Sequence, residues 1–467
     1  MVYRPTIGLE IHAELKTRTK MFCDCRNDPD ETRPNVNVCP ICLAHPGTLP
    51  KANRQAVEHV LRVGKALNGE LADYSEFDRK SYFYPDIPKG YQISQYAYPF
   101  VSKGSLAGVE VTRVHLEEDT ARSSHEGDGG SLIDFNRAGV PLMELVTEPV
   151  IHDAQTAGRF ARELQLLLRT LGVSDANLEK GEMRVEANIS VSKDDTLGTK
   201  TEVKNLNSFR SVERAIAYEV DRQINVLEEG GTLVQETRGW NEDKQETFSQ
   251  RAKEGSADYR YFPEPDLPKV KRSEVKEWSD KKLTDALPEL PAARRARYEE
   301  LGLKPDDAAY VAGDEERGAF FDDSISQLKD SELILLAANY FVTDLSGLIA
   351  KSGKGKVTPE SFASLVRLVY AGTLSSRGAK EVLAVLHEKG GDAEAVAKSE
   401  GLVQVNDTET LRESVKEAIR LNEGPASEYR AGKEAALQFL VGQAMKATKG
   451  AGNPGVLKDL LIEELGK

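Results

Sequence analysis

The fold of this chain is decided by the stretch Ile7-Gly8-Leu9-Glu10-Ile11-His12-Ala13-Glu14. Apolar side chains alternate with polar ones along it, which is the pattern of a strand with one face in the core. Side chains two apart on a strand point the same way, roughly 7 Å apart, so Glu10 and His12 can reach one ion or one phosphate. The stretch therefore predicts a strand that presents ligands on its second face.

Size and composition set the class of protein. At 467 residues, with 39% hydrophobic and 30% charged residues, the chain is too long for one core and is typical of globular proteins with two to four domains. No window approaches about 18 consecutive apolar residues, and the N-terminus has no apolar signal region, so we expect no membrane span and a cytoplasmic location. A net charge of −14 argues against a protein coated in nucleic acid but not against one local basic groove.

The first 290 residues alternate between strand and helix patterns. Several predicted strands follow one another without a helix between them, which favours an α+β fold with a largely antiparallel sheet over a doubly wound one. Glycines 127, 129 and 130 are expected to form a hairpin turn. We predict strands at 6–14, 109–118, 131–135, 139–147, 183–192 and 199–206, and helices at 51–68, 152–171 and 208–229.

The character changes at Leu287-Pro288-Glu289-Leu290-Pro291, a stiff linker beyond which strand patterns nearly vanish. We therefore expect a mixed domain at 1–290, a helical domain at 291–400 and a small helical tail at 401–467, whose apolar stripes are best explained as core packing. Helices are predicted at 292–301, 330–350, 359–371, 376–389, 409–421, 427–449 and 455–465.

Four cysteines, Cys23, Cys25, Cys39 and Cys42, are the whole cysteine content of the chain. They form C-x-C and C-x2-C pairs separated by 13 residues, and two short-spaced pairs joined by a loop match a tetrahedral zinc site. Four thiolates leave no open coordination position, so we expect a structural Zn²⁺. Four free thiols are the alternative, and His45 is a less favoured replacement for one thiolate.

Three further carboxylates are oddly placed on predicted strands. Glu118 and Glu144 each share a strand face with apolar residues, whereas Glu186 lies on a wholly polar face. A carboxylate among apolar neighbours is costly unless it is paired or binds a cation. Several strands that each present one carboxylate would form a site for Mg²⁺, or for Mn²⁺ if a histidine joins it. From spacing alone, ion pairs with Arg122, Arg137 or Arg184 explain these residues equally well.

The common phosphate-binding loops are absent from the sequence, so any ATP site must use other residues. Lys204 and Asn205 stand at a strand-to-helix junction where free N–H groups can bind an anion, although Asn207 or Ser208 can equally cap that helix. A second candidate is the aromatic segment 258–266, either a substrate wall or a loop that crosses the sheet. We take Lys204, Asn205 and Arg260 as candidate nucleotide-binding residues.

The chain resembles the GatB family of tRNA-dependent amidotransferase subunits, which is related to GatE, over essentially its whole length. The C-terminal GNPGVLKDLLIEEL at 452–465 is similar to the tail that this family shares with YqeY proteins. The matching stretches are IGLEIHAEL at 7–15, SYFYPDIPKGYQISQY at 81–96, HLEEDTAR at 115–122, DFNRAGVPLMELVTEP at 134–149, RVEANIS at 184–190, EVKNLNSF at 202–209 and DYRYFPEPDLP at 258–268.

The resemblance implies a fold and a reaction. The fold is the glutamine synthetase and guanidino kinase type of catalytic domain. The reaction is a glutamine-dependent ligase reaction in which ATP phosphorylates the side-chain carboxylate of Glu-tRNA(Gln) or Asp-tRNA(Asn), and ammonia from the amidase subunit GatA then attacks. GatC is the third subunit, and the tail of the chain is expected to contact the tRNA.

The resemblance also implies roles for individual residues. Glu10, His12, Glu118 and Glu144 would hold the metal at the phosphoryl site. Glu186 stands where many relatives have Asp, and Lys89 or Lys204 would neutralise developing charge. Zinc is a feature of a subgroup of the family. The alternative is a non-catalytic scaffold subunit that binds tRNA and keeps these carboxylates in ion pairs.

Overall fold

The computed structural model describes residues 3–126, 130–252, 259–404, 408–448 and 452–466. The chain divides into two compact units, Met1–Leu290 and Pro291–Lys467. The first unit contains all the strands named below, and the second is helical.

One large sheet forms the centre of the first unit. Its strands are β1 (Arg4–Glu14), β2 (Glu70–Leu71), β6 (Val101–Ser102), β7 (Ser105–Leu106), β8 (Val109–Glu118), β11 (Pro141–Thr147), β12 (Met183–Ser192), β13 (Thr201–Leu206), β14 (Glu236–Asn241) and β15 (Glu246–Ala252). They lie in the order β15-β14-β13-β12-β1-β11-β8-β6-β2, with β7 paired to β8. The pairings described are antiparallel except that of β13 with β14, which is parallel. The predicted α+β class is confirmed.

The strands that the sequence predicts at 6–14, 109–118, 139–147, 183–192 and 199–206 correspond to β1, β8, β11, β12 and β13. The sequence did not predict β14 and β15, because they form a polar hairpin at the sheet edge and show little apolar alternation. The expected turn at Gly127 and Gly129 lies outside the described residues, but the flanking strands β9 (Arg122–Glu126) and β10 (Gly130–Asp134) pair antiparallel.

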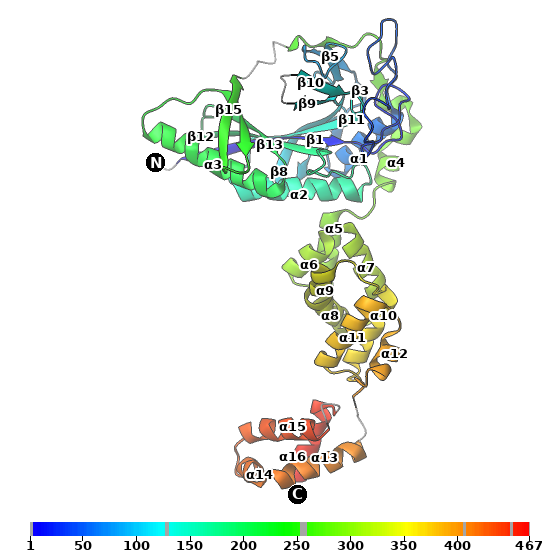
Figure 1. Cartoon of the computed structure of the whole chain (residues 1–467), viewed down its shortest axis with the longest axis vertical. Helices are drawn as coiled ribbons and strands as arrows, with labels where there is room; N and C mark the ends of the chain where they lie inside the picture. The colour runs from blue at the N-terminus through cyan, green and yellow to red at the C-terminus, as the bar shows by residue number, and fades with distance from the viewer. Residues whose placement is uncertain (1–2, 127–129, 253–258, 405–407, 449–451, 467) are drawn as a thin grey trace. The chain divides into compact units, whose positions relative to one another are not determined.

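Helices cover one face of the large sheet. α2 (Ala154–Thr170) and α3 (Phe209–Glu228) lie along that face (Figure 1). With α1 (Arg54–Ala66), they enclose a core that includes the buried side chains of Ile7, Leu9 and Ile11 from β1. Asp153 and Ser208 cap α2 and α3 by accepting hydrogen bonds from backbone N–H groups. The capping role considered for Ser208 is therefore the one observed. Because helices cover one face of the sheet, the polar side chains of its strands project from the opposite face.

Small sheets lie on that opposite side (Figure 1). One of them has the order β16-β4-β5, another pairs β17 with β3, and β9–β10 forms a third. These short strands are β3 (Tyr74–Ser75), β4 (Asp78–Ser81), β5 (Tyr91–Ser94), β16 (Phe262–Pro263) and β17 (Val270–Lys271). Two 3-10 turns, η2 (Arg272–Glu274) and η3 (Lys276–Trp278), and helix α4 (Asp280–Asp285) complete the unit. Segments from sequence positions 74–94 and 262–271 thus cover the polar face of the large sheet.

The second unit contains two separate clusters of buried apolar side chains, one within residues 298–397 and one within 411–465. The helix predicted at 427–449 is two helices, because the chain turns at Gly432 with φ of 97°. The elements are α5 (Pro291–Glu300), α6 (Pro305–Ala312), α7 (Glu315–Ile325), α8 (Ser331–Asn339), the π-helical turn η4 (Tyr340–Leu345), α9 (Ser346–Ser352), α10 (Pro359–Tyr370), α11 (Ser376–Lys389), α12 (Ala393–Ser399), α13 (Thr408–Leu421), α14 (Glu423–Arg430), α15 (Ala435–Ala447) and α16 (Pro454–Leu465).

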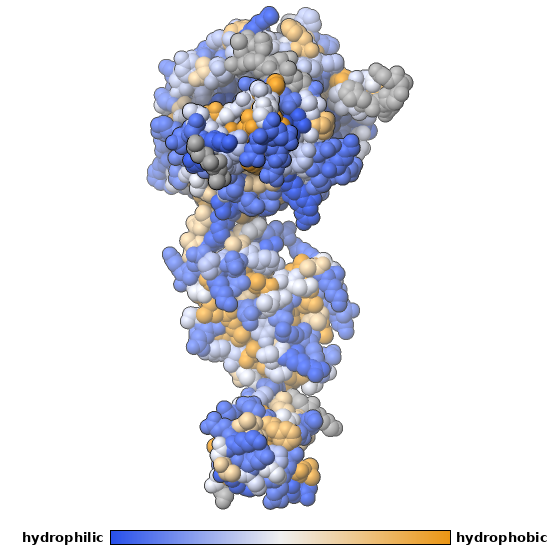
Figure 2. Space-filling view, turned by 90° about the vertical axis from the view of Figure 1, so that its left-hand side faces the viewer, coloured by the Kyte–Doolittle hydropathy of each residue, from blue (hydrophilic) through white to orange (hydrophobic). Residues whose placement is uncertain are grey.

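The continuous helical stretch Ser331–Ser352 is long and apolar enough to cross a membrane by length and composition, which differs from the expectation of no such segment. Figure 2 shows apolar side chains on the surface of the helical unit, and Leu335 and Ile349 of this stretch are among the exposed ones. Phe341 and Leu345 of the same stretch are buried in the core of the unit. One such helix is weak support for a membrane span, because helices of a protein core pass the same test.

Candidate active site

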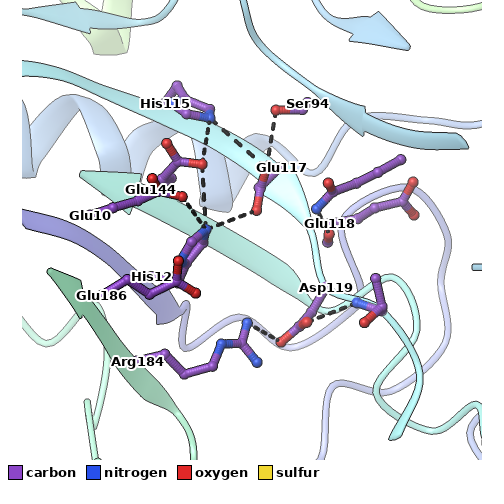
Figure 3. Close-up of polar contacts among 12 residues, drawn as sticks. Glu10, His12, Ser94, His115, Glu117, Glu118, Asp119, Glu144, Arg184 and Glu186 are labelled. Atoms are coloured by element: carbon purple, nitrogen blue, oxygen red, sulfur yellow. Dashed lines mark hydrogen bonds and ion pairs between the residues drawn. The ribbon is translucent and has the colours of Figure 1, made fainter. Parts of the chain in front are cut away.

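The polar face of the large sheet carries a dense group of acidic and histidine side chains (Figure 3). Antiparallel pairing places His12 of β1 opposite Glu144 of β11 on one side and opposite Arg184 of β12 on the other. Glu10 lies opposite Glu186 of β12 in the same way. Because β1 buries its apolar side chains under α2 and α3, its alternate residues must project to this face. The structure thus brings Glu10, His12, Glu144 and Glu186 together.

His12 is the centre of the group. Its Nε2 lies 3.4 Å from Glu144 Oε2, 3.6 Å from Glu117 Oε1 and 4.0 Å from Glu10 Oε1. Burial by itself lowers the pKa of His12, but the hydrogen bond and charge of Glu144, with the other carboxylates, raise it to about 9. Burial and the charges of Glu144 and Glu186 raise the pKa of Glu10 to about 7. The carboxylates contribute to both shifts, and their negative charge also favours a bound cation.

The sequence did not predict two further potential metal ligands, His115 and Glu117 of β8. His115 lies opposite Glu144 in the strand register, with its Nε2 3.5 Å from Glu144 Oε2. Ser94 donates a hydrogen bond to Glu117, 3.1 Å away. Burial lowers the pKa of His115 to about 4, so its imidazole stays neutral and can bind a metal. The same two-residue spacing that singles out Glu10 and His12 could have found this pair.

The resemblance implies that Glu118 holds the metal together with Glu10, His12 and Glu144, but the carboxylate of Glu118 lies outside that group. Successive side chains on a strand point to opposite faces, so Glu118 points away from the face of Glu117. Its carboxylate lies 2.7 Å from Lys89 Nζ and accepts a hydrogen bond of 3.0 Å from the Ile93 backbone N–H. Both residues of this ion pair line a cavity of about 200 Å³ beside the cysteine loop. Glu117, not Glu118, therefore completes the group around His12, and Lys89 lies with Glu118.

A second group of carboxylates continues along the same face. Glu10, Glu186 and Glu202 offer oxygen atoms within 4.8 Å of one another. Lys204 Nζ lies 2.8 Å from Glu186 Oε2 and 3.9 Å from Glu202 Oε2. Burial lowers the pKa of Lys204, but the charges of Glu186 and Glu202 outweigh it and raise the pKa above its usual range. Glu202 was not predicted. Lys204 lies within this group, and its role in neutralising developing charge stays a prediction.

Asn205 and Arg260, the other two candidates for nucleotide binding, have exposed side chains. Asn205 has φ of 65°, in a part of β13 where the register with β12 shifts. Arg260 has φ of 46°. The polar contacts described for the carboxylate group include neither residue, so their role stays a prediction.

The Tyr-rich string at 81–96 and residues 259–266 of the aromatic segment form one wall rather than two features. Phe262 of β16 pairs with Arg79 of β4. Tyr96 stacks on Tyr261 with ring centroids 4.4 Å apart, and Tyr82 meets Tyr259 at 6.4 Å. The polar groups behind this wall are therefore shielded by aromatic rings contributed by distant parts of the sequence.

Lys80 joins this aromatic wall to the carboxylate group. Its Nζ lies 4.9 Å from the centre of the Tyr259 ring. Burial lowers the pKa of Lys80, but the charges of Glu117 and Glu144 outweigh burial and raise it. This half-buried lysine beside the carboxylates is a further candidate residue that the sequence reasoning missed.

The alternative explanation, that Glu118, Glu144 and Glu186 form ion pairs with nearby arginines, holds only in part. Arg184 and Arg137 contact Asp119 rather than the predicted carboxylates, with nitrogen–oxygen distances of 2.8 and 3.7 Å. Arg113 lies 3.4 Å from Glu144. Glu118, Glu144 and Glu186 thus have basic partners other than the expected arginines, namely Lys89, Arg113 and Lys204. The oxygen and imidazole donors of the group also suit Mg²⁺ or Mn²⁺. The described residues thus provide overlapping candidate cation sites, which share Glu144 or Glu10.

The four cysteines also come together. Cys42 Sγ lies 4.0 Å from Cys25 Sγ and 3.9 Å from Cys39 Sγ, and all four sulfur atoms lie within 4.8 Å of one another. Sulfur atoms in a tetrahedral zinc site are about 3.8 Å apart, given Zn–S bonds of about 2.3 Å. The Cys39 backbone N–H also donates to Cys42 Sγ, at 3.1 Å. The cluster fits zinc without His45, which lines the neighbouring cavity.

Residues 5–277, which carry the carboxylate group and the cysteines, match the family described as the GatB/GatE catalytic domain. The chain belongs to the GatB/GatE family. Residues 319–465 match the GatB domain of this family. The chain is therefore similar to GatB proteins in both of its units, as the quoted sequence stretches predict.

Curated relatives match along nearly their full length. A protein of Thermomicrobium roseum is 46% identical over 100% of this chain and 99% of its own length. A protein of Geobacillus kaustophilus is 44% identical over the whole of both chains, and one of Crocosphaera subtropica is 42% identical over 98% of this chain and 97% of its own. All three carry the name of the B subunit of an aspartyl/glutamyl-tRNA(Asn/Gln) amidotransferase.

Proposed function

We propose that this chain is the B subunit of a tRNA-dependent amidotransferase, a glutamine-hydrolysing ligase. It phosphorylates the side-chain carboxylate of Glu-tRNA(Gln), Asp-tRNA(Asn) or both with ATP, and ammonia then converts the activated group to the amide. The observation that carries this proposal is the group of overlapping cation sites around His12 and Glu144, within the segment that matches the GatB/GatE catalytic domain. The glutamine synthetase and guanidino kinase type of fold is part of the same proposal.

The reaction needs activation because a carboxylate oxygen is a poor leaving group. One carboxylate oxygen of the aminoacyl side chain attacks the γ-phosphorus of ATP, and the bond to ADP breaks. The ammonia nitrogen then attacks the carbonyl carbon, phosphate leaves with the former carboxylate oxygen, and ammonia loses one proton. Phosphoryl transfer depends mainly on positioning and on neutralisation of charge.

The residues of the sheet face supply both requirements. Mg²⁺ or Mn²⁺, when bound, neutralises charge on the phosphoryl oxygens. Glu144 would hold this cation, either with Glu10 and His12 or with Glu117 and the neutral His115. Lys80 and Lys204 place ammonium groups at the two ends of the carboxylate group, where they can attract phosphate oxygens.

The aromatic wall protects the activated intermediate. An acyl phosphate hydrolyses in water, so the site must exclude water until ammonia arrives. The stacked pair Tyr96–Tyr261 and the neighbouring Tyr82–Tyr259 pair cover the side on which Lys80 meets the carboxylates. This role gives the Tyr-rich string a function that its sequence does not reveal.

The other components follow from the family. We propose GatA as the source of ammonia, GatC as the third subunit, a cytoplasmic complex, a tail at 401–467 that contacts the tRNA, and a structural zinc ion on Cys23, Cys25, Cys39 and Cys42. Structural zinc sites hold short loops that lack a core of their own, which describes residues 23–42.

The test compares catalysis with tRNA binding. In a complex with the amidase and third subunits, release of phosphate from ATP should depend on Glu-tRNA(Gln) or Asp-tRNA(Asn). Glu10→Ala and Glu144→Ala should abolish amidation but leave tRNA binding unchanged. Glu110 is an exposed residue of the same sheet, so Glu110→Ala should leave both amidation and tRNA binding unchanged. Unchanged amidation by the first two variants would favour the scaffold alternative instead.

A further inference from the structure

Lys20 is a fully buried lysine outside the site described above. Its exposed fraction is 0%, and lysine is almost never buried to this extent without a charged partner. Its ammonium donates a hydrogen bond of 3.2 Å to the Phe135 carbonyl and lies 3.9 Å from Cys42 Sγ. Within the part of the chain that the structure describes, no carboxylate forms an ion pair with it. One carbonyl oxygen is a poor counterpart for a buried positive charge.

The cysteine cluster provides the missing negative charge. Four thiolates around one Zn²⁺ carry a net charge of −2, and Cys42, the ligand that Lys20 approaches, is itself buried. An ammonium that donates N–H to a zinc-bound sulfur compensates part of this charge and stabilises the thiolate. The geometry points to Lys20 as the charge-compensating donor of the zinc–cysteine centre, an inference that rests on the zinc site proposed above.

Lys20 also connects the cysteine loop to the catalytic sheet. Phe135, which accepts the hydrogen bond from Lys20, lies in the segment between β10 and β11, and β11 carries Glu144. The next residue, Met21, donates its backbone N–H to Gly139 of that segment at 2.7 Å. Gly139 has φ of 84°, and a Cβ atom there would lie 3.6 Å from both Cys42 Cβ and Lys20 Cδ. The zinc centre and the start of β11 therefore meet at the Lys20 side chain.

The competing explanation is that Lys20 only fills space with its aliphatic stem. Lys20→Met distinguishes the two explanations, because methionine keeps most of the volume and removes the charge. Lys20→Arg keeps the charge. Lys16→Met is the matched control, since Lys16 lies four residues away with a side chain that is 61% exposed and pairs with Asp175.

The experiment measures zinc on the full-length chain. Metal content is determined after purification, zinc transfer to a chromogenic chelator is followed in time, and Co²⁺ is substituted to record the thiolate-to-metal absorption bands. We expect Lys20→Met to lose zinc affinity by about tenfold or more, the usual effect of removing such a partner, and to shift the Co²⁺ bands. Lys20→Arg and Lys16→Met should behave like the unchanged protein.

Equal zinc affinity and identical Co²⁺ spectra for Lys20→Met and the unchanged protein would overturn the inference. If the unchanged protein binds no zinc and shows no tetrathiolate spectrum, the zinc proposal itself fails, and this inference fails with it. Circular dichroism of each variant with saturating zinc verifies that the fold is retained, and Lys20→Gln provides a second neutral variant if Lys20→Met does not fold.

Discussion

His12 and Glu144 face each other across neighbouring antiparallel strands, with 3.4 Å between Nε2 and Oε2. His115 on the next strand approaches the same carboxylate at 3.5 Å. One glutamate thus lies between two histidines contributed by different strands, and the register of β1, β11 and β8 fixes this arrangement. The sheet itself, rather than a mobile loop, positions the groups proposed to bind the catalytic cation.

Glu144→Gln should abolish amidation while it leaves the fold intact. The amide keeps the shape of the side chain but removes the charge that both histidines and the proposed cation share, so we expect a loss of roughly 10²–10³-fold in kcat. Phosphate release from ATP in the assembled complex is the measurement, and Glu110→Gln is the exposed control on β8. Activity within a few-fold of the unchanged enzyme would contradict the role given to Glu144.

Glu117→Gln and Glu118→Gln should have different effects, although the two residues are adjacent. Glu117 faces His12, so its loss should weaken Mn²⁺ binding, measured by the manganese-dependent increase in the midpoint of thermal unfolding. Glu118 pairs with Lys89 and not with His12, so its loss should leave Mn²⁺ binding unchanged and reduce the free energy of unfolding by about 1–3 kcal/mol. The opposite pattern would restore the ligand set expected from the family resemblance.

The pKa shifts predict how stability depends on pH. Glu10 and His12 hold their protons more tightly in the folded chain, with pKa values raised to about 7 and about 9. The contribution of Glu10 is complete below about pH 4.5 and is lost as the pH rises through about 7, and that of His12 is complete below about 6.5 and is lost through about 9.

A cation competes with these protons, so Mn²⁺ should raise the unfolding midpoint more at about pH 9 than at about pH 6. Scanning calorimetry with and without Mn²⁺ provides the measurement, and Glu144→Gln should flatten the difference. A manganese effect of equal size at both pH values would rule out this linkage.

Tyr261→Ala should uncouple the two halves of the reaction. Without the ring that stacks on Tyr96, water should reach the acyl phosphate, and more phosphate should be released for each amide formed. The measurement is the ratio of phosphate to amidated tRNA under single-turnover conditions. Tyr370→Ala, an exposed tyrosine of the helical unit, should keep the original ratio, and an unchanged ratio for Tyr261→Ala would remove the wall from the mechanism.

The sequence predicts site residues correctly on a strand that has one apolar face and one polar face. This is the case for β1, and Glu10 and His12 lie on the polar face as the alternation requires. In β8 the run His115-Leu116-Glu117-Glu118 has a carboxylate on each face, so the pattern alone cannot tell which one joins the cluster. Glu118 stood out because its neighbours Val114 and Leu116 are apolar, but these residues belong to the core face.

Contacts between distant segments were beyond the reach of sequence patterns. Lys80 gains its role from Glu117, Glu144 and Tyr259, none of which is near it in the sequence. The pairing of β4 with β16, which unites the two aromatic segments, depends on tertiary folding in the same way. The cysteine cluster was easier to predict, because its four ligands lie within one short loop.

The most direct test of the proposed cation site is a crystal structure of the chain with Mn²⁺, recorded at a wavelength where manganese scatters anomalously. We predict anomalous density between His12, Glu10 and Glu144, or between His115, Glu117 and Glu144, at coordination distances of about 2.0–2.3 Å. Density at Glu118 and Lys89, or no density at either of these two positions with saturating Mn²⁺, would contradict the account.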